Sequence, residues 1–242
     1  TLYIGGGTPS LLGEKGLLYL QKLLEPVKFS DNIEFTKELN PGAWNEPTIE
    51  TAKKIGVNRF SIGVQSLDDR FLKRLGRIHK AEEALTTLDY FQKNSENFSV
   101  DLMLGLPFST IYKRDIKSEI DQILSKNPTH LSVYILTTKS GYKYAGELPS
   151  EEYIEKEYLF VSEYLKEQGY EHYEVSNFAK DKKYSRHNLK YWNGESVAGL
   201  GPSATGLLVA KANALRYKWN DELPKKTLEN LSPEEIKLEK FY

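Results

Sequence analysis

Three consecutive glycines stand where a β-prone segment meets the start of a helix, and they are the residues best suited to hold a ligand. Residues 2–4 are apolar, residues 5–7 are glycines, and residues 8–10 (Thr-Pro-Ser) are typical of a helix start. Backbone N–H groups beside a helix N-terminus suit an anion or a polar ligand. A tight turn between a strand and a helix, with no ligand, explains the same residues equally well.

Polar side chains also stand at the ends of the later apolar segments. Glu38, Gln65, Asp101 and Thr137 each lie at or just after the end of such a segment. In barrels of parallel strands, the carboxyl ends of the strands carry the ligand site. This coincidence predicts one pocket that these residues share with the glycines.

The segments that carry these residues alternate between strand and helix patterns. Strand patterns lie at residues 2–4, 33–39, 57–64, 98–104 and 130–136, and helix patterns lie at 11–25, 48–55, 68–75, 81–93 and 113–125. Mostly continuous apolar strands are typical of a parallel sheet that helices cover. Five such units in one series predict an α/β fold that is a barrel or partial barrel more than a doubly wound sheet.

The pattern changes at residue 150. In order, there follow a helix pattern at 151–168, a strand pattern at 170–176, a loop that carries residues 186–192 and a turn of small residues at 199–206. The last stretch, 221–242, is charged, and we expect it to be helical after the N-terminal cap at residues 232–235. We expect three parts, namely a partial barrel at 1–149, a smaller α+β extension at 150–220 and the start of a helical domain at 221–242. The sequence begins within a strand pattern and stops within a helix pattern, so we expect it to be clipped at both ends.

Composition and charge narrow the class of protein. The chain has 242 residues, 28% of them charged and 39% hydrophobic, with a net charge of -1. This balance gives no electrostatic reason to expect nucleic acid or an anionic membrane as a partner. No apolar run approaches the roughly 20 residues of a membrane helix, and the first segment lacks the features of a signal peptide. We therefore expect a cytoplasmic protein.

Six sequence motifs, in this order, resemble one known family. They are residues 5–10 (GGGTPS), 38–42 (ELNPG), 59–66 (RFSIGVQS), 75–77 (LGR), 101–107 (DLMLGLP) and 185–192 (SRHNLKYW). Each motif alone is weak, but six in order are specific. The chain resembles the radical S-adenosylmethionine (SAM) proteins related to oxygen-independent coproporphyrinogen III oxidase, and most of all their HemW-like haem-chaperone branch. The resemblance implies a partial (β/α) barrel of the radical SAM type, with its first strand missing here.

By motif position, the resemblance implies that Gly6, Gly7 and Thr8 meet the methionyl part of SAM, with Glu38 nearby. SAM carries an ammonium, a carboxylate and a sulfonium, so backbone N–H donors together with a carboxylate suit it.

Gln65, Arg77 and Asp101 match further SAM-contact positions of the family. Asp101 at a strand end suits ribose hydroxyls, and Arg77 suits a carboxylate. Each residue taken singly also has a structural interpretation, in which Arg77 forms a surface ion pair and Asp101 is a capping carboxylate.

The family's iron–sulfur cluster is the main point of departure. Family members hold a [4Fe–4S] cluster through Cys-x-x-x-Cys-x-x-Cys upstream of the glycine motif. This sequence contains no cysteine, so these residues supply no cluster ligand, and no metal-ligating or catalytic residue is assigned. We expect the cluster segment to precede Thr1, because a barrel without its first strand exposes a sheet edge. Whether the chain is an enzyme stays open.

The motif His-Asn-x-x-Tyr-Trp, here at residues 187–192, is associated with haem binding in the HemW-like branch. Imidazole is a common axial ligand of haem iron, so His187 is the candidate ligand. Tyr191 and Trp192 are suited to pack against a porphyrin. A structural loop pinned by two aromatic side chains, or a lid over the SAM pocket, explains the same residues.

The resemblance implies a protein of haem metabolism that binds haem and transfers it to a recipient protein. The alternative is an oxygen-independent coproporphyrinogen III oxidase, which decarboxylates propionates by radical chemistry and takes a porphyrinogen as its substrate. A third interpretation, a phosphate-binding barrel enzyme unrelated to SAM, leaves Gln65 and Arg77 without a shared ligand.

Overall fold

The computed structural model describes residues 1–95, 97–210, 213–221, 224–232 and 234–235. They form two compact units, one of Leu2–Tyr184 and one of Ser185–Tyr242 to which Thr1 also belongs. The three-part division predicted from the sequence, with limits at 150 and 221, stays a prediction.

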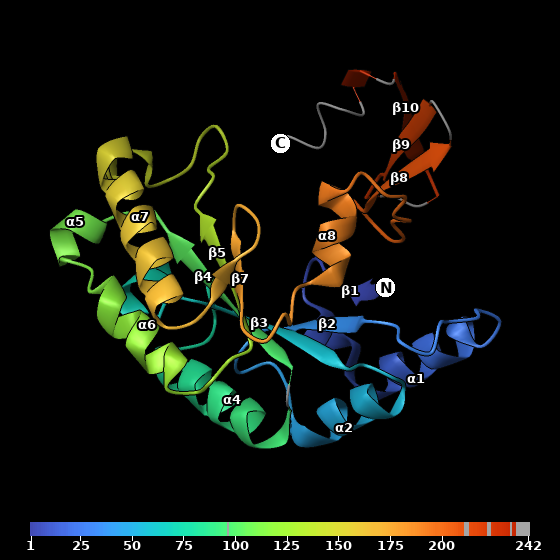
Figure 1. The fold of residues 1–242 in the computed structure, drawn as a ribbon, viewed down its shortest axis with the longest axis horizontal. Helices are drawn as coiled ribbons and strands as arrows, with labels where there is room; N and C mark the ends of the chain where they lie inside the picture. Colours follow the sequence, from blue (N-terminus) through green and yellow to red (C-terminus); the bar gives the residue numbers. More distant parts are fainter. Residues whose placement is uncertain (96, 211–212, 222–223, 233, 236–242) are drawn as a thin grey trace. The chain divides into compact units, whose positions relative to one another are not determined.

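The first unit is built on one seven-stranded sheet (Figure 1). The strand order is β1-β2-β3-β4-β5-β7-β6, in which the first five strands are parallel and β7 runs antiparallel to both β5 and β6. The strands are β1 (Leu2–Ile4), β2 (Phe35–Leu39), β3 (Arg59–Gln65), β4 (Phe98–Leu104), β5 (His130–Ile135), β6 (Glu171–His172) and β7 (Asn177–Ala179). The predicted α/β fold with a parallel sheet is confirmed. Within the described residues the sheet is open, since β1 and β6 lie at its two ends.

Helices connect the parallel strands and lie along the outer face of the curved sheet (Figure 1). They are α1 (Gly13–Leu24), α2 (Glu46–Lys54), α3 (Asp69–Arg74), α4 (Ala81–Asn94), α5 (Ser109–Tyr112), α6 (Ile116–Leu124) and α7 (Glu151–Glu167), with short 3-10 helices at η1 (Pro9–Leu12) and η2 (Ala145–Glu147). Asparagine, aspartate and serine caps begin several of them; for example, the Asn45 side chain accepts from the Thr48 N–H at the start of α2.

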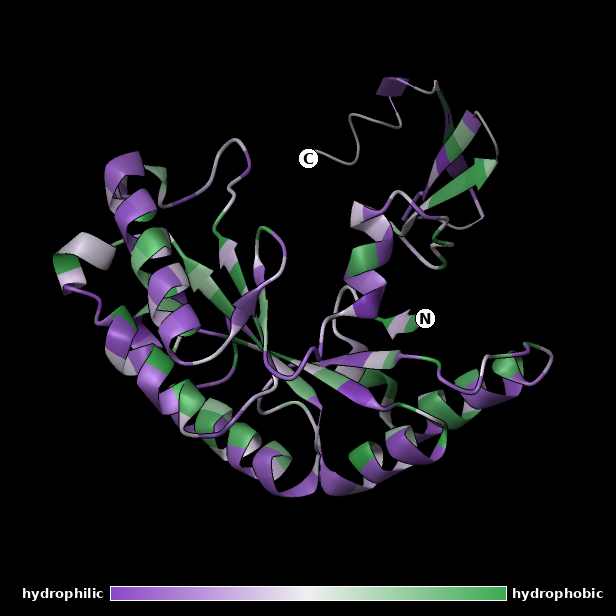
Figure 2. Ribbon diagram, viewed as in Figure 1, coloured by the Kyte–Doolittle hydropathy of each residue, from purple (hydrophilic) through white to green (hydrophobic). Residues whose placement is uncertain are grey.

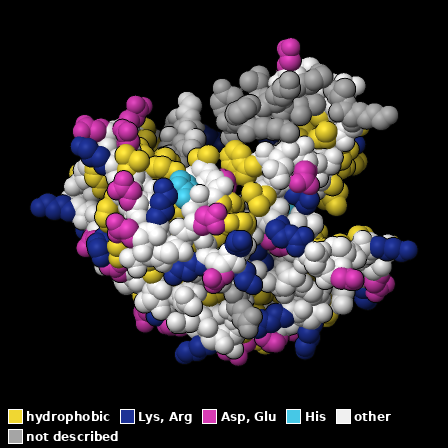
Figure 3. Space-filling model, in the orientation of Figure 1, with side chains coloured by type: hydrophobic (Ala, Val, Ile, Leu, Met, Phe, Trp, Pro, Cys, Tyr) yellow, Lys and Arg dark blue, Asp and Glu magenta, His cyan; other side chains and the backbone are white. Residues whose placement is uncertain are grey.

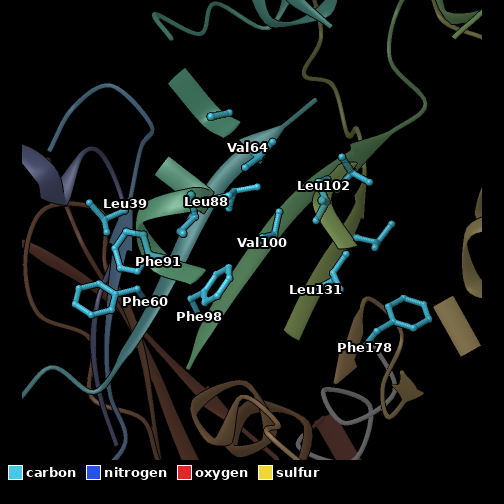
Figure 4. Close-up of a cluster of buried hydrophobic side chains, with 14 of the residues drawn as sticks. Leu39, Phe60, Val64, Leu88, Phe91, Phe98, Val100, Leu102, Leu131 and Phe178 are labelled. Carbon is cyan, nitrogen blue, oxygen red and sulfur yellow. The ribbon is translucent and has the colours of Figure 1, made fainter. Parts of the chain in front are cut away.

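The hydrophobic core lies between the sheet and these helices. Phe91 of α4 packs against Phe60 of β3 and Phe98 of β4, with ring centroids 5.0 and 6.1 Å apart. Figure 4 shows these rings together with Leu88, Val100 and other buried side chains. In Figure 2 the strands β4 and β5 are mostly apolar in colour, whereas the helices carry long hydrophilic stretches. Burial of this apolar layer is the main force that holds the parallel sheet in place.

The antiparallel end of the sheet departs from prediction. The strand predicted at residues 170–176 is only β6, Glu171–His172, and β7 was not predicted. A tight reversal causes the difference, because Asn177 N–H donates to the Glu174 carbonyl and the chain then pairs with β5. The segment's polar–apolar alternation does not show this turn.

The second unit contains α8 (Arg186–Trp192) and a three-stranded antiparallel sheet of β8 (Thr205–Ala210), β9 (Asn213–Trp219) and β10 (Lys226–Leu231). The loop predicted at residues 186–192 is wrong, because these residues form a helix that Ser185 caps by accepting from the Asn188 N–H.

Lys226–Leu231, in the stretch expected to begin a helical domain, is an edge strand that pairs with β9. Ser232 and Glu235 do make the reciprocal contacts of a capping box, with Ser232 N–H donating to Glu235 Oε2 at 2.8 Å. Residues 236–242 lie outside the described residues.

Surface charge agrees with the near-neutral composition. Figure 3 shows basic and acidic side chains mixed over the visible face of the described residues. No helix among the described residues is both long enough and apolar enough to cross a membrane.

Candidate functional site

A polar cleft of about 250 Å³ lies at the carboxyl ends of β1 to β4. The residues that line it come from the loop after β1, from β2 and its end, from β3, from β4 and from the segment after α3. They are Gly6, Gly7, Pro9, Glu38, Leu39, Asn40, Ser61, Gly63, Gln65, Arg77 and Asp101. Parallel strands bring their carboxyl ends to one edge, which is why residues so far apart in sequence meet here. Six of the eight predicted site residues are among them.

The glycine turn and Glu38 form one wall of the cleft. The Glu38 carboxylate accepts from the Gly6 N–H at 3.0 Å and from the Tyr3 hydroxyl at 2.8 Å. Gly6 and Gly7 both have positive φ angles, 74° and 54°, which only glycine adopts readily. A Cβ built on either would meet no atom within 4 Å, so the space beside this backbone is open to a ligand.

Asp101 and Ser61 form the floor of the cleft, on the neighbouring strands β4 and β3. The Ser61 hydroxyl donates to Asp101 Oδ1 at 3.0 Å. Burial raises the pKa of the Asp101 carboxyl to about 6, an effect that this hydrogen bond opposes and the nearby Glu38 reinforces. The charged form of such a carboxylate is stabilised by a ligand that carries a positive charge or hydroxyl groups.

Arg77, Asn40 and Gln65 form the opposite wall. Arg77 Nη1 donates to Asn40 Oδ1 at 3.3 Å. Desolvation lowers the pKa of the Arg77 guanidinium, while the charge of Asp101 acts in the other direction. Gln65 lies close by, since a Cβ on Gly63 would come within 2.9 Å of Gln65 Nε2 and 3.3 Å of Asn40 Oδ1. Gly63 is therefore needed for the side-chain amide to lie over the strand.

Two of the eight predicted site residues lie elsewhere, and Thr137, which was also expected to share the pocket, does not line the cleft. Thr8 is half-buried and comes just before η1, but it does not line the cleft. His187 belongs to the second unit, on α8, where its Nδ1 lies 3.0 Å from Thr1 Oγ1 and its ring packs edge-on against Tyr191 with centroids 5.3 Å apart.

Sequence reasoning missed three residues of the site. Tyr3 anchors Glu38, Asn40 accepts from Arg77, and Ser61 donates to Asp101. The strand pattern at residues 2–4 could have indicated Tyr3, because neighbouring side chains in a strand point to opposite faces of the sheet and the Tyr3 side chain therefore points away from those of Leu2 and Ile4.

The cleft thus joins two carboxylates, one guanidinium, two side-chain amides and an open stretch of glycine backbone. A ligand that carries both positive charge and a carboxylate finds a partner for each charge here. The described residues include no group of three or more His, Asp or Glu side chains placed to hold a metal ion.

Comparisons with known proteins agree on one family. Residues 1–117 match the radical SAM superfamily. The chain is 35% identical over 210 residues to the heme chaperone HemW of Buchnera aphidicola, and 35% identical over 218 residues to that of Bacillus subtilis. These matches take in 85% and 86% of this chain but 55% and 57% of the relatives. The chain therefore spans about half the length of the curated relatives it matches.

A solved structure shares the fold. Coproporphyrinogen III oxidase (HemN) from Escherichia coli, described as a radical SAM enzyme, superposes with a TM-score of 0.76 over 92% of this chain and 54% of its own length. At 21% sequence identity, this likeness concerns the fold alone.

Proposed function

We propose that the chain binds SAM in the cleft and acts in haem handling, because residues 1–117 match the radical SAM superfamily and the chain is similar to HemW-like proteins. The observation that carries the SAM assignment is the meeting of Glu38, Gln65 and Asp101 with the glycine turn around one cleft.

The charges of the cleft fit those of SAM. Glu38 and Asp101 supply negative charge for its ammonium and sulfonium, and Arg77 supplies the counter-charge for its carboxylate. The Gly6 N–H already donates to Glu38, so Gly6 contributes mainly by the shape of its backbone. The Asp101 carboxylate, which lines the cleft from the middle of β4, suits the hydroxyls of the ribose.

The family implies a [4Fe–4S] cluster, which supplies the electron that cleaves SAM. The 242 residues contain no cysteine, so none of their side chains is a standard ligand for that cluster. The role proposed for these residues is therefore to bind and orient SAM.

For the haem part of the function, we propose a chaperone that binds haem and passes it to a recipient protein, in the cytoplasm. The support is the name of the relatives together with α8, on which His187 and Tyr191 lie one turn apart with their rings in contact. In this proposal the His187 imidazole is the axial ligand of the haem iron. The oxidase alternative has no observation at the site in its favour.

A haem titration followed by absorption spectroscopy tests this part. The unmodified chain is expected to give a Soret band typical of histidine ligation, and His187→Ala is expected to shift that band and to weaken binding. His172→Ala is the matched control, because His172 is also half-buried but lies in the first unit. A His187→Ala spectrum identical to that of the unmodified chain would remove His187 as the ligand.

A further inference from the structure

Gln65 reaches the cleft from a backbone conformation that glutamine rarely adopts. Its φ angle is 68°, and it sits where the register of β3 against β4 shifts between Ile62 and Gln65. The next residue turns sharply, with the Ser66 N–H donating to the Val64 carbonyl at 2.9 Å. A side chain at positive φ is strained, and such a conformation persists only where the surroundings hold it.

A buried carboxylate holds the two residues that follow. Glu119 Oε2 accepts from the Ser66 hydroxyl at 2.7 Å and from the Leu67 N–H at 2.7 Å. Glu119 lies on α6, more than fifty residues away in sequence, and is only 5% exposed. Two short hydrogen bonds to an ionised acceptor in a dry environment fix the direction in which the chain leaves Gln65.

Arg114 fixes that carboxylate in turn. Its side chain is completely buried, and its Nε donates to Glu119 Oε1 at 2.7 Å. Arg114 Nη1 also donates to the Met103 carbonyl at 2.7 Å and lies 3.4 Å from Glu157 Oε1, while Glu157 Oε2 accepts from the Gly105 N–H at 2.8 Å. The three buried ions join the end of β3, the end of β4, α6 and α7.

The backbone conformation at Gln65 determines where its side-chain amide lies in the cleft. Its amide lies over Gly63, next to the Asn40 oxygen that accepts from Arg77. If the backbone at Gln65 relaxed to a negative φ, the side chain would leave this position and one wall of the cleft would lose its amide.

We propose that Glu119, held by Arg114, is a positioning residue that fixes Gln65 for SAM binding although it does not line the cleft. That SAM is the ligand rests on the proposed function, whereas the hold of Glu119 on the chain around Gln65 rests on the hydrogen bonds alone. Sequence alone does not indicate it, because an acidic residue within a charged amphipathic helix reads as a solvated one.

A double-mutant cycle tests this coupling in the 242-residue chain. SAM affinity is measured by calorimetry for the unmodified chain, Glu119→Gln, Gln65→Gly and the double variant. We expect Glu119→Gln to weaken SAM binding about tenfold in the unmodified background and to change it less than about twofold in the Gln65→Gly background. Glycine adopts the positive φ without strain and has no side chain to misplace.

Two further variants guard against a general loss of structure. Ser66→Ala removes one link and leaves the Arg114–Glu119 pair intact, so it should weaken SAM binding in the same direction by a smaller factor. Asp121→Asn is the control on α6, because Asp121 is exposed and pairs with Lys117 away from the cleft; it should leave SAM affinity unchanged. An equal loss for Glu119→Gln in both Gln65 backgrounds, or no loss in either, would overturn the proposal.

Hydrogen exchange separates this proposal from the proposed function. In Glu119→Gln and not in Asp121→Asn, the amides of Ser66 and Leu67 should exchange at least about tenfold faster in the absence of SAM. An unmodified chain that binds no SAM would refute the proposed function and the role in SAM binding, whereas faster exchange would still support the hold of Glu119 on Gln65. Unchanged exchange would overturn that hold.

Discussion

Replacing Asp101 by asparagine is expected to stabilise the chain at neutral pH and to weaken its binding of SAM. Burial raises the pKa of the Asp101 carboxyl from 3.8 to about 6, despite the hydrogen bond from Ser61. In an unfolded chain such a carboxyl titrates near its ordinary pKa of about 3.9. The folded state therefore binds this proton more tightly than the unfolded state does. Stability consequently falls as pH rises from about 4 to about 6 and stays lower above that range.

The size of the effect follows from the two pKa values. One pKa unit corresponds to about 1.36 kcal/mol, so ionised Asp101 lowers the free energy of unfolding by about 3 kcal/mol at neutral pH. Asparagine has nearly the same shape, carries no charge and keeps an oxygen that accepts from Ser61. We expect Asp101→Asn to raise the free energy of unfolding by about 2–3 kcal/mol at about pH 7.5 and by almost nothing at about pH 4.

Urea denaturation across this pH range measures the effect, with Asp89→Asn as the control. Asp89 is half-exposed and pairs with Lys126, so its substitution should change stability by less than about 1 kcal/mol at either pH. SAM affinity of Asp101→Asn, measured by calorimetry, should fall about tenfold or more, because the cleft loses one of its two carboxylates. An asparagine variant that is less stable at about pH 7.5, or that gains as much at about pH 4, would refute this reasoning.

Two other substitutions give separate tests. Gly6→Val places a branched side chain at a φ of 74° and in the open space beside the glycine backbone, so it should abolish SAM binding in calorimetry and lower the free energy of unfolding by about 1–3 kcal/mol. Normal SAM affinity in this variant would show that the glycine turn is not part of the SAM site. Lys37→Met should stabilise the chain by about 3 kcal/mol below about pH 8, because burial lowers the pKa of the Lys37 ammonium from 10.5 to about 8. In urea titrations this gain in stability should disappear above about pH 10.5, and a gain that does not depend on pH would contradict the role of the buried ammonium.

The parallel half of the fold was predictable because its strands are long apolar runs separated by helices with caps. The strand predicted at residues 98–104 is β4, and the helix predicted at 81–93 is α4, within one residue. The second unit was less predictable. Lys226–Leu231 lies in the stretch expected to begin a helical domain, but it forms a strand because it pairs with β9. Such pairing depends on residues distant in sequence, which local propensity does not report.

For the site, the sequence located residues at strand ends but not what holds them. Glu38 and Asp101 were found because charged residues within or at the end of apolar strands are conspicuous, although Asp101 lies in the middle of β4 and not at its end. Tyr3 lies within an apolar run, and Glu119 lies within an ordinary helix, so neither pattern points to the cleft. Their roles come from contacts made only after folding, the Tyr3 hydroxyl with Glu38 and Glu119 with the chain after Gln65.

A crystal structure of the chain with SAM tests the central claim most directly. We expect the methionyl group beside Gly7 and Glu38, and the ribose within hydrogen-bonding distance of the Asp101 carboxylate. SAM bound outside the cleft lined by Glu38, Gln65 and Asp101, or a cleft that remains empty at saturating SAM, would contradict it.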